Sequence, residues 1–215
     1  TFSREWFENV ERHRYRAEPF IHTFAKFARY RGKKVLEIGV GAGTDHVQWA
    51  KADAECYGVD LTEAAIRTTS EHLKVHGLRS RLTRLDAESL PFEDSFFDVV
   101  YSWGVIHHSD RPERLISEIY RVLKPEGTFI GMVYGRRSVA AYRMWVKHAL
   151  FKARPWKSRA KVISEHVESY NTKAYTTGEL DKIFYQFKEF ETEPILTLSD
   201  TRRLPRWLIP YLPNH

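Results

Sequence analysis

Short apolar runs alternate with segments of helical spacing from residue 33 onward. Each run is bounded by Gly, Asp or a charged turn, as expected of buried strands. The five runs lie at residues 35–38, 56–59, 81–85, 97–102 and 128–133. Because strands that alternate with helices form parallel sheets covered on both faces, the pattern predicts an α/β, Rossmann-like fold.

The segments around these runs carry helix start and stop signals. Residues 62–76 end at Gly77, and Asp110 is placed to cap a helix before a turn at residues 124–127. Helices are also expected at residues 4–16 and 19–30, where they would form an N-terminal lid. Core positions of the Asp110 helix are predicted at Leu115, Ile116, Ile119, Tyr120 and Leu123.

The alternation stops after the fifth run and resumes with a last strand candidate at residues 190–196. Thr176 and Glu179 have the spacing of a capping box that opens a helix with Leu180, Ile183, Phe184 and Phe187 on one face. One domain over residues 1–215 is therefore expected. Its parts are a helical lid (1–32), a core (33–133), a helical substrate cap inserted after strand five (134–186), and a C-terminal strand and tail (187–215).

Composition narrows the class of protein. The 215 residues are 42% apolar and 14% aromatic, which is enough to bury a core. The lone Cys56 excludes an intramolecular disulfide, and no Cys/His spacing predicts a metal site. No apolar run has membrane-spanning length and the start is not signal-like, so a cytoplasmic location is expected. Because the first residue is Thr1 and not Met, a processed, trimmed or partial chain is expected.

A glycine-rich turn follows the first run, in the sequence VLEIGVGAGT at residues 35–44. Gly39, Gly41 and Gly43 would let the backbone turn tightly and approach a bound nucleotide without Cβ clashes. Their spacing differs from the G-x-G-x-x-G of NAD and FAD sites, and the chain has no G-x-x-x-x-G-K-[ST] loop for ATP. Taken alone, the glycines fit a tight turn equally well.

Carboxylates end three successive runs of the predicted sheet. Asp60 lies 23 positions after Glu37 and could accept both hydroxyls of a ribose, although capping the next helix is an alternative role. Asp86 closes the third run, where it could accept from an adenine amino group. Since the carboxyl ends of parallel strands line the ligand crevice, the coincidence of these residues indicates a nucleotide-like ligand.

The ordered motifs VLEIGVGAGT, YGVD, LDAESLPF, FFDVVYSWGVIHH and RVLKPEGTFI fall between residues 33 and 133. As a set they resemble the class I methyltransferases that use S-adenosylmethionine (SAM), of the small-molecule type that includes quinone-ring and sugar methylating enzymes. The resemblance implies SAM as methyl donor and S-adenosylhomocysteine as product. The donor residues it implies are Tyr15, Arg16, Glu37, Gly39, Gly41, Gly43, Asp60, Leu61, Asp86, Ala87, Ser102 and Trp103.

By the same resemblance, Glu37 would position the methionine ammonium through the glycine turn, and Ser102 with Trp103 would line the methionine end. Tyr15 and Arg16 would close over the donor, with Arg16 at its carboxylate. The family's sheet ends in an antiparallel hairpin, but residues 201–215 lack a strand pattern. A seventh strand would therefore follow residue 215, or this region differs.

Methyl transfer is an in-line displacement that depends mainly on positioning, so few reactive side chains are required. A hydroxyl or thiol acceptor must lose a proton, and His107 or His108, after the fourth run, is a candidate base. The alternative is that one of the two packs under the loop and the other is solvated. His166, between Glu165 and Glu168, is a second candidate or a surface residue, and Tyr134 and Arg136 are candidate substrate residues.

Positive charge is concentrated after the fifth run: residues 136–161 contain nine Lys or Arg and no Asp or Glu, in a chain of net charge +6. Three interpretations stay open, namely an ordinary packed cap, contact with an anionic or lipid-linked acceptor or a membrane surface, and nucleic-acid binding. The apolar face of this segment is predicted to comprise Val139, Tyr142, Trp145, Val146, Ala149 and Leu150.

The sequence thus favours a SAM-dependent methyltransferase that acts on a small-molecule or glycan-like acceptor, with oxygen the favoured atom. Base methylation is disfavoured because the chain lacks a [DN]-P-P-[YFW] motif and Cys56 lies within a strand, and a single thiol disfavours arsenic methylation. A SAM-binding accessory protein without turnover and an RNA methyltransferase that uses the basic face are the alternatives. Nucleic acid is the less expected partner, and the oligomeric state stays open.

Overall fold

The computed structural model describes residues 2–167 and 171–201, and the chain divides into two compact units, Thr1–Met132 and Val133–His215. The second unit begins where the sequence predicts an insertion; the single-domain organisation stays a prediction. The strands of the first unit are β1 (Lys34–Ile38), β2 (Glu55–Asp60), β3 (Arg81–Arg84), β4 (Phe97–Trp103) and β5 (Leu123–Met132). Its helices are α1 (Arg4–Ala17), α2 (Ile21–Ala25), η1 (Phe27–Tyr30), α3 (Thr44–Lys51), α4 (Glu63–Val75), η2 (Ile106–His108) and α5 (Pro112–Val122).

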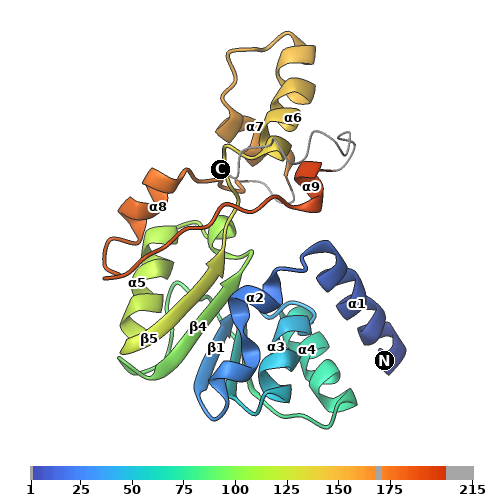
Figure 1. Ribbon diagram of the computed structural model, residues 1–215, viewed down its shortest axis with the longest axis vertical. Coiled ribbons are helices and arrows are strands. Elements are labelled where there is room, and N and C mark those ends of the chain that lie inside the picture. Colours follow the sequence, from blue (N-terminus) through green and yellow to red (C-terminus); the bar gives the residue numbers. More distant parts are fainter. Residues whose placement is uncertain (1, 168–170, 202–215) are drawn as a thin grey trace. The chain divides into compact units, whose positions relative to one another are not determined.

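All five strands run parallel in the order β3-β2-β1-β4-β5. Helices cover both faces of this sheet, with α5 on one face and α3 and α4 on the other (Figure 1). The central strands β1, β2 and β4 are mostly buried because their side chains are apolar on both faces, as Leu36, Val99 and Val100 illustrate with exposures of 1% or less. The predicted Rossmann-like fold and its five strands are confirmed.

Strand β5 begins earlier than predicted. Leu123 pairs with Phe97 and Thr128 pairs with Val99, so the residues between Leu123 and Thr128 form an irregularity in the ladder. The turn expected at residues 124–127 is therefore part of the strand. A bulge of this kind accommodates the extra residues while both ends of the ladder stay paired.

The helices around the sheet confirm most of the start and stop signals. Thr62 caps α4 through a bond from the Ala65 N–H, and Gly77 follows the helix in a left-handed conformation with φ +68°. The prediction that Asp110 caps α5 was wrong. Arg111 occupies the N-cap, where its guanidinium has no acceptor for a capping bond, and Pro112 starts the helix with its preset φ.

The predicted core of α5 is confirmed for Leu115, Ile116, Ile119 and Leu123, which are at most 7% exposed. Tyr120 was placed there wrongly, because its side chain is 44% exposed. It lies next to Ile119 on the helix, at the edge of the apolar stripe, where a phenol can keep its hydroxyl in water.

The N-terminal segment contains α1 as predicted, but the single helix expected over residues 19–30 is broken into α2 and η1. Lys26 lies between them with φ +48°, in the left-handed region. This turn lets both Ile21 and Phe27 reach the core, where Phe27 packs edge-on against Trp49 at 4.5 Å. The gain from burying both side chains overrides the continuous helical pattern.

The second unit is a small helical body with α6 (Val139–His148), η3 (Leu150–Lys152), α7 (Arg159–His166), α8 (Thr177–Ile183) and α9 (Leu198–Thr201). The capping box of Thr176 and Glu179 is confirmed at the start of α8. The strand expected at residues 190–196 is absent from this described segment, since Glu191, Glu193 and Pro194 interrupt the apolar run and Pro194 has no N–H for a ladder. Residues 202–215 lie outside the described residues. Within the described ranges no helix is long and apolar enough to cross a bilayer.

Candidate functional site

The three glycines after β1 all have positive φ, at +81° for Gly39, +54° for Gly41 and +75° for Gly43. A Cβ at Gly39 would lie 2.2 Å from Val105 Cγ2, and one at Gly43 would lie 2.9 Å from Thr69 Cγ2. A Cβ at Gly41 would meet nothing within 4 Å. Gly39 and Gly43 are therefore required for packing inside the protein, whereas Gly41 exposes bare backbone to open space.

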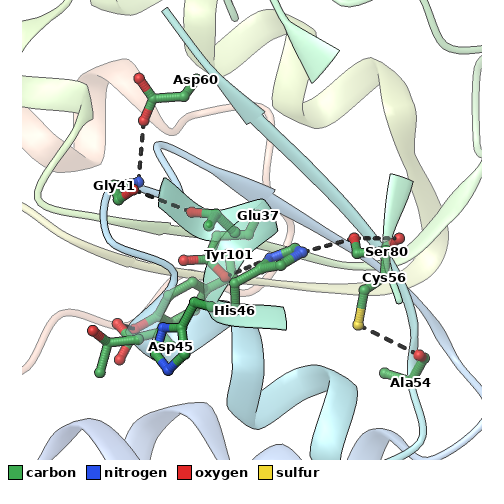
Figure 2. A network of polar contacts seen from close by, with 12 residues as sticks. Glu37, Gly41, Asp45, His46, Ala54, Cys56, Asp60, Ser80 and Tyr101 are labelled. Atoms are coloured by element: carbon green, nitrogen blue, oxygen red, sulfur yellow. Dashed lines mark hydrogen bonds and ion pairs between the residues drawn. The ribbon is translucent and has the colours of Figure 1, made fainter. Parts of the chain in front are cut away.

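Asp60 lies at the end of β2 and points toward this open backbone (Figure 2). Its Oδ2 accepts a hydrogen bond from the Gly41 N–H at 3.2 Å, and its Oδ1 accepts from the Thr62 N–H and hydroxyl, both at 2.9 Å. The carboxylate is thus held in a fixed orientation while it stays partly exposed. The next residue, Leu61, is 65% exposed.

Glu37 does not face the open side of the turn. It is 4% exposed, and its Oε2 lies 3.0 Å from His46 Nδ1 on α3. His46 Nε2 in turn lies 2.8 Å from Ser80 Oγ, whose hydroxyl donates to the Cys56 carbonyl at 2.9 Å (Figure 2). Because the Ser80 proton is used on Cys56, His46 must carry its proton on Nε2.

The protonation states of this pair follow from the geometry. Burial raises the pKa of Glu37 well above its usual range and lowers the pKa of His46 to about 3. A neutral His46 with its proton on Nε2 has a bare Nδ1, so the protonated Glu37 carboxyl donates to it. Glu37 therefore joins β1 to α3, the helix that follows the glycine turn, through a buried network for which the chain carries no local sequence signal.

Asp86 follows β3 on the surface, and its Oδ1 accepts from the Glu88 N–H at 2.9 Å. Glu88 is a site residue that the sequence analysis missed. Its 6% exposed carboxylate accepts from the Ser109 hydroxyl at 2.7 Å and from the Arg111 N–H at 2.9 Å. Burial alone would raise the pKa of Glu88, but these bonds and the Arg111 guanidinium lower it. Glu88 therefore fixes Asp86 and Ala87 against the loop that follows β4.

Ser102 and Trp103 end β4. The Ser102 side chain is fully buried, and its Oγ has no hydrogen-bond partner in the described chain. The Trp103 indole N–H donates to Glu18 at 3.0 Å, and its ring stacks on Tyr101. In the order β3-β2-β1-β4, the residues Asp86, Asp60, Glu37 and Ser102 thus lie at the carboxyl ends of adjacent strands, as predicted.

Helix α1 is joined to this edge of the sheet through Asp45, a second residue that the sequence analysis missed. The 4% exposed carboxylate accepts from Arg14 at 2.8 Å, from the Tyr15 hydroxyl at 3.0 Å and from the Tyr101 hydroxyl at 2.8 Å. Burial and the Asp45 charge raise the pKa of Tyr15. Tyr15 is therefore held at the start of α3, whereas Arg16 is exposed and lies outside this cluster.

A family model described as a methyltransferase domain matches residues 36–131. These residues, somewhat less than half of the chain, are therefore similar in sequence to a methyltransferase domain. The match runs from Leu36 in β1 to Gly131 in β5 and includes the strand-end residues Glu37, Asp60, Asp86, Ser102 and Trp103.

The chain spans about half or less of the length of the curated methyltransferases that it matches. The uncharacterized methyltransferase YcgJ of Bacillus subtilis is 35% identical over 98 residues, 45% of this chain and 39% of that protein. The phthiotriol/phenolphthiotriol dimycocerosates methyltransferase of Mycobacterium tuberculosis is 37% identical over 100 residues, 46% and 36% of the two chains. The ubiquinone biosynthesis O-methyltransferase of Methylococcus capsulatus is 31% identical over 124 residues, 57% and 52% of the two chains.

The crystal structure of YcgJ superimposes with a TM-score of 0.60 at 22% identity, over 79% of this chain and 67% of that one. The methyl donor of such a domain is SAM. The residues present fit it: Gly41 offers open backbone, Asp60 offers an oriented carboxylate, and Ser102 offers a buried hydroxyl that no described group satisfies. The described residues include no group of three or more His, Cys, Asp or Glu placed to hold a metal.

The two candidate bases, His107 and His108, differ in burial. His107 is fully buried in η2, where burial and the neighbouring His108 lower its pKa to about 3. His108 is exposed, and its ring lies 4.3 Å from that of His107. His107 is therefore a poor proton acceptor near neutral pH, which leaves His108 as the better candidate of the two.

The candidate substrate residues lie in the second unit. Tyr134 packs against a small cluster of Ala141, Ile163 and Ala174. The Arg136 guanidinium donates to the Ala174 carbonyl at 2.8 Å and to Glu179 at 2.8 Å, so it stabilises the unit itself. His166 is exposed and stacks on His148 at 4.1 Å, and Glu165 Oε2 lies 3.9 Å from its Nε2; Glu168, its other predicted neighbour, lies outside the described residues.

Proposed function

We propose that the chain transfers a methyl group from SAM to a small-molecule acceptor, with an acceptor oxygen favoured. The observation that carries this proposal is the oriented Asp60 carboxylate beside the open Gly41 backbone. This pair combines an anionic hydrogen-bond acceptor with a site of close backbone approach, and both are needed by a ribose-containing donor.

The strand ends divide the work of holding the donor. Asp60 would accept the ribose hydroxyls, Asp86 with Ala87 would hold the adenine, and the exposed Leu61 would offer it an apolar contact. Ser102 would donate its buried hydroxyl at the methionine end beside Trp103, and Tyr15 and Arg16 would contribute from α1. Glu37 would act indirectly, through His46 on the helix that follows the glycine turn.

When bound, SAM supplies an electrophilic methyl group on a sulfonium centre. The chain contributes mainly by holding the acceptor in line, which accounts for a large share of the rate in such displacements. Where the acceptor is a hydroxyl, His108 takes its proton. His107 is a weaker base, because its pKa is about 3 and it would hold a proton only below about that pH.

The acceptor class is inferred from charge and from the relatives. Two of the relatives are a dimycocerosates methyltransferase and a ubiquinone biosynthesis O-methyltransferase, and these names support an apolar or lipid-linked acceptor for this chain. The nine Lys or Arg within residues 136–161 support an acceptor that also carries negative charge. Tyr134 and His166 remain candidate contacts to it.

Calorimetric titration with SAM tests the donor site. Asp60→Ala is expected to weaken SAM binding by about thirtyfold, because hydrogen bonds to a charged group are worth about 2 kcal/mol. The SAM affinity of Asp60→Asn should lie between those of the unaltered chain and Asp60→Ala, since the Asn amide oxygen still accepts one bond while the charge is lost. Unchanged SAM affinity in Asp60→Ala with an intact fold would remove the basis of the proposal.

The two alternatives separate in one further assay. A SAM-binding accessory protein would bind SAM and yield no S-adenosylhomocysteine with any acceptor in a metabolite screen. An RNA methyltransferase would yield methylated RNA in preference to methylated metabolites. The proposed reaction is supported if S-adenosylhomocysteine forms with a small acceptor and does not form with RNA.

A further inference from the structure

The connection between α6 and α7 carries three exposed large apolar side chains. Phe151 is 80% exposed, Trp156 is 77% exposed and Leu150 is 46% exposed. None of them belongs to the small core cluster around Ala141 and Ile163. Single exposed apolar residues are common, but three on one short connection between helices leave an apolar surface that a partner could cover.

This connection, residues 149–157, is an ordered structure that we call the α6–α7 turn (Figure 1). The Ala153 N–H donates to the Leu150 carbonyl at 3.0 Å, and the Arg154 N–H donates to the Ala149 carbonyl at 2.9 Å. The Trp145 indole N–H donates to the Lys157 carbonyl at 2.6 Å and so ties the end of the turn to α6. The exposed aromatic rings therefore project from a fixed backbone, which lowers the entropy cost of placing them in a partner.

Basic residues lie close to these rings in the sequence. Lys147, Lys152 and Arg154 are exposed, and none forms a salt bridge with another described residue. The basic residues nearer α7 are engaged: Lys157 pairs with Glu165 at 2.7 Å, and the Arg159 guanidinium lies 4.1 Å from the Tyr142 ring centroid. The turn and the end of α6 thus carry both exposed cations and exposed aromatic rings, while Lys157 and Arg159 stabilise the unit.

We propose that the α6–α7 turn is a docking surface for an anionic phospholipid membrane. Trp and Phe are suited to the headgroup region, where an apolar ring can enter the acyl boundary, and Lys and Arg beside them face lipid phosphates. A single-stranded nucleic acid is less suited to this surface, because such ligands need a groove that follows roughly 4–16 nucleotides. The rings here stand on a nine-residue turn between two helices.

Vesicle flotation with the full chain tests this proposal. Binding to vesicles of phosphatidylcholine mixed with phosphatidylglycerol is expected, with little binding to phosphatidylcholine alone and release at high salt. The double variant Phe151→Ser/Trp156→Ser should lose about tenfold in partitioning. The triple variant Lys147→Gln/Lys152→Gln/Arg154→Gln should lose binding to the anionic vesicles by a similar factor.

Matched controls come from the same chain. Tyr185→Ser removes an aromatic ring that is 75% exposed elsewhere in the second unit. Arg67→Gln/Lys74→Gln/Arg79→Gln removes three exposed charges from the first unit. Both controls should float like the unaltered chain, and thermal melting should show that all variants fold. Equal loss in the controls would mean that overall charge or hydrophobicity, and not the turn, causes binding.

Three other outcomes would overturn the proposal. The unaltered chain could fail to float on anionic vesicles, or it could bind a single-stranded oligonucleotide through the turn. The Phe151→Ser/Trp156→Ser variant alone could also change oligomeric state. SAM titration is the independent measurement, since the variants should keep full SAM affinity. If the unaltered chain floats on anionic vesicles but does not bind SAM, the proposed function is contradicted and the docking surface is still supported.

Discussion

Residues at the strand ends have two different roles, buried support and ligand contact, which the sequence does not distinguish. Glu37, Asp60 and Asp86 all end strands, but Glu37 is buried against His46, whereas Asp60 and Asp86 stay accessible. The glycines divide in the same way, since Gly39 and Gly43 make room for neighbours and Gly41 faces open space. Among these carboxylates and glycines, Asp60, Asp86 and Gly41 are the ones that a ligand can touch directly.

Gly41→Val is expected to abolish SAM binding while the chain still folds. Its side chain would enter the open space above the turn, and the positive φ adds a strain of about 1–2 kcal/mol. Gly32→Val is the matched control, because Gly32 has φ +70° and a Cβ added there would also meet nothing within 4 Å. Calorimetry and melting of both variants should show equal destabilisation and a loss of SAM affinity in Gly41→Val alone.

His107 should make stability depend on pH. Its pKa of about 3 in the folded chain lies below the ordinary value of 6.5, so the unfolded chain takes up a proton first as pH falls. The contribution of His107 is complete above pH 6.5 and is lost toward pH 3, at about 1.4 kcal/mol per pH unit. In His107→Leu, denaturant titrations across this range should show a slope smaller by one proton.

His46 and Glu37 are the same in the unaltered chain and in His107→Leu. Burial shifts their pKa values in opposite directions, so their contributions to the slope partly cancel and do not affect the difference. An unchanged slope in His107→Leu would mean that burial does not lower the pKa of His107 in the folded chain.

At the scale of elements, polar side chains join segments that are far apart in the sequence. Asp45 joins α1 to α3 and β4. Glu88 joins the turn after β3 to the loop before α5. Arg136 joins the start of the second unit to the start of α8. Each carries a charge that sequence analysis would assign to the surface or to a ligand.

Arg136→Gln is expected to destabilise the second unit by about 2 kcal/mol, because a partly buried guanidinium loses bonds to a carbonyl and a carboxylate. Arg137→Gln is the matched control, since Arg137 is exposed and should change the free energy of unfolding by less than about 0.5 kcal/mol. Urea titration monitored by circular dichroism measures both. Equal stability of the two variants would contradict this structural role of Arg136 and would favour the substrate contact predicted from the sequence.

At the scale of the whole molecule, the net charge of +6 arises largely from the second unit, whose residues 136–161 contribute nine positive charges. A field of this kind raises the local concentration of anionic ligands and speeds their association at low salt. Since Arg136 is engaged in structure, the steering role falls on its exposed neighbours.

Arg137→Gln/Arg143→Gln is therefore expected to raise KM for an anionic acceptor by about tenfold at low salt, with a smaller effect on kcat. The difference should disappear near 1 M salt, where screening limits charge interactions to about 3 Å. SAM affinity should be unchanged. Steady-state kinetics across a salt series measures this, and an unchanged KM would show that the segment only packs or docks.

The sequence by itself determined the five parallel strands and the identity of the strand-end residues. It could do so because buried strands need apolar runs, and the glycine turn and the carboxylates are local in the chain. The tertiary structure alone decided which of those residues are accessible, that Asp45 and Glu88 join distant segments, that His107 is buried and that Arg136 is structural. Burial and pairing depend on contacts across many residues, and no local pattern of side chains encodes them.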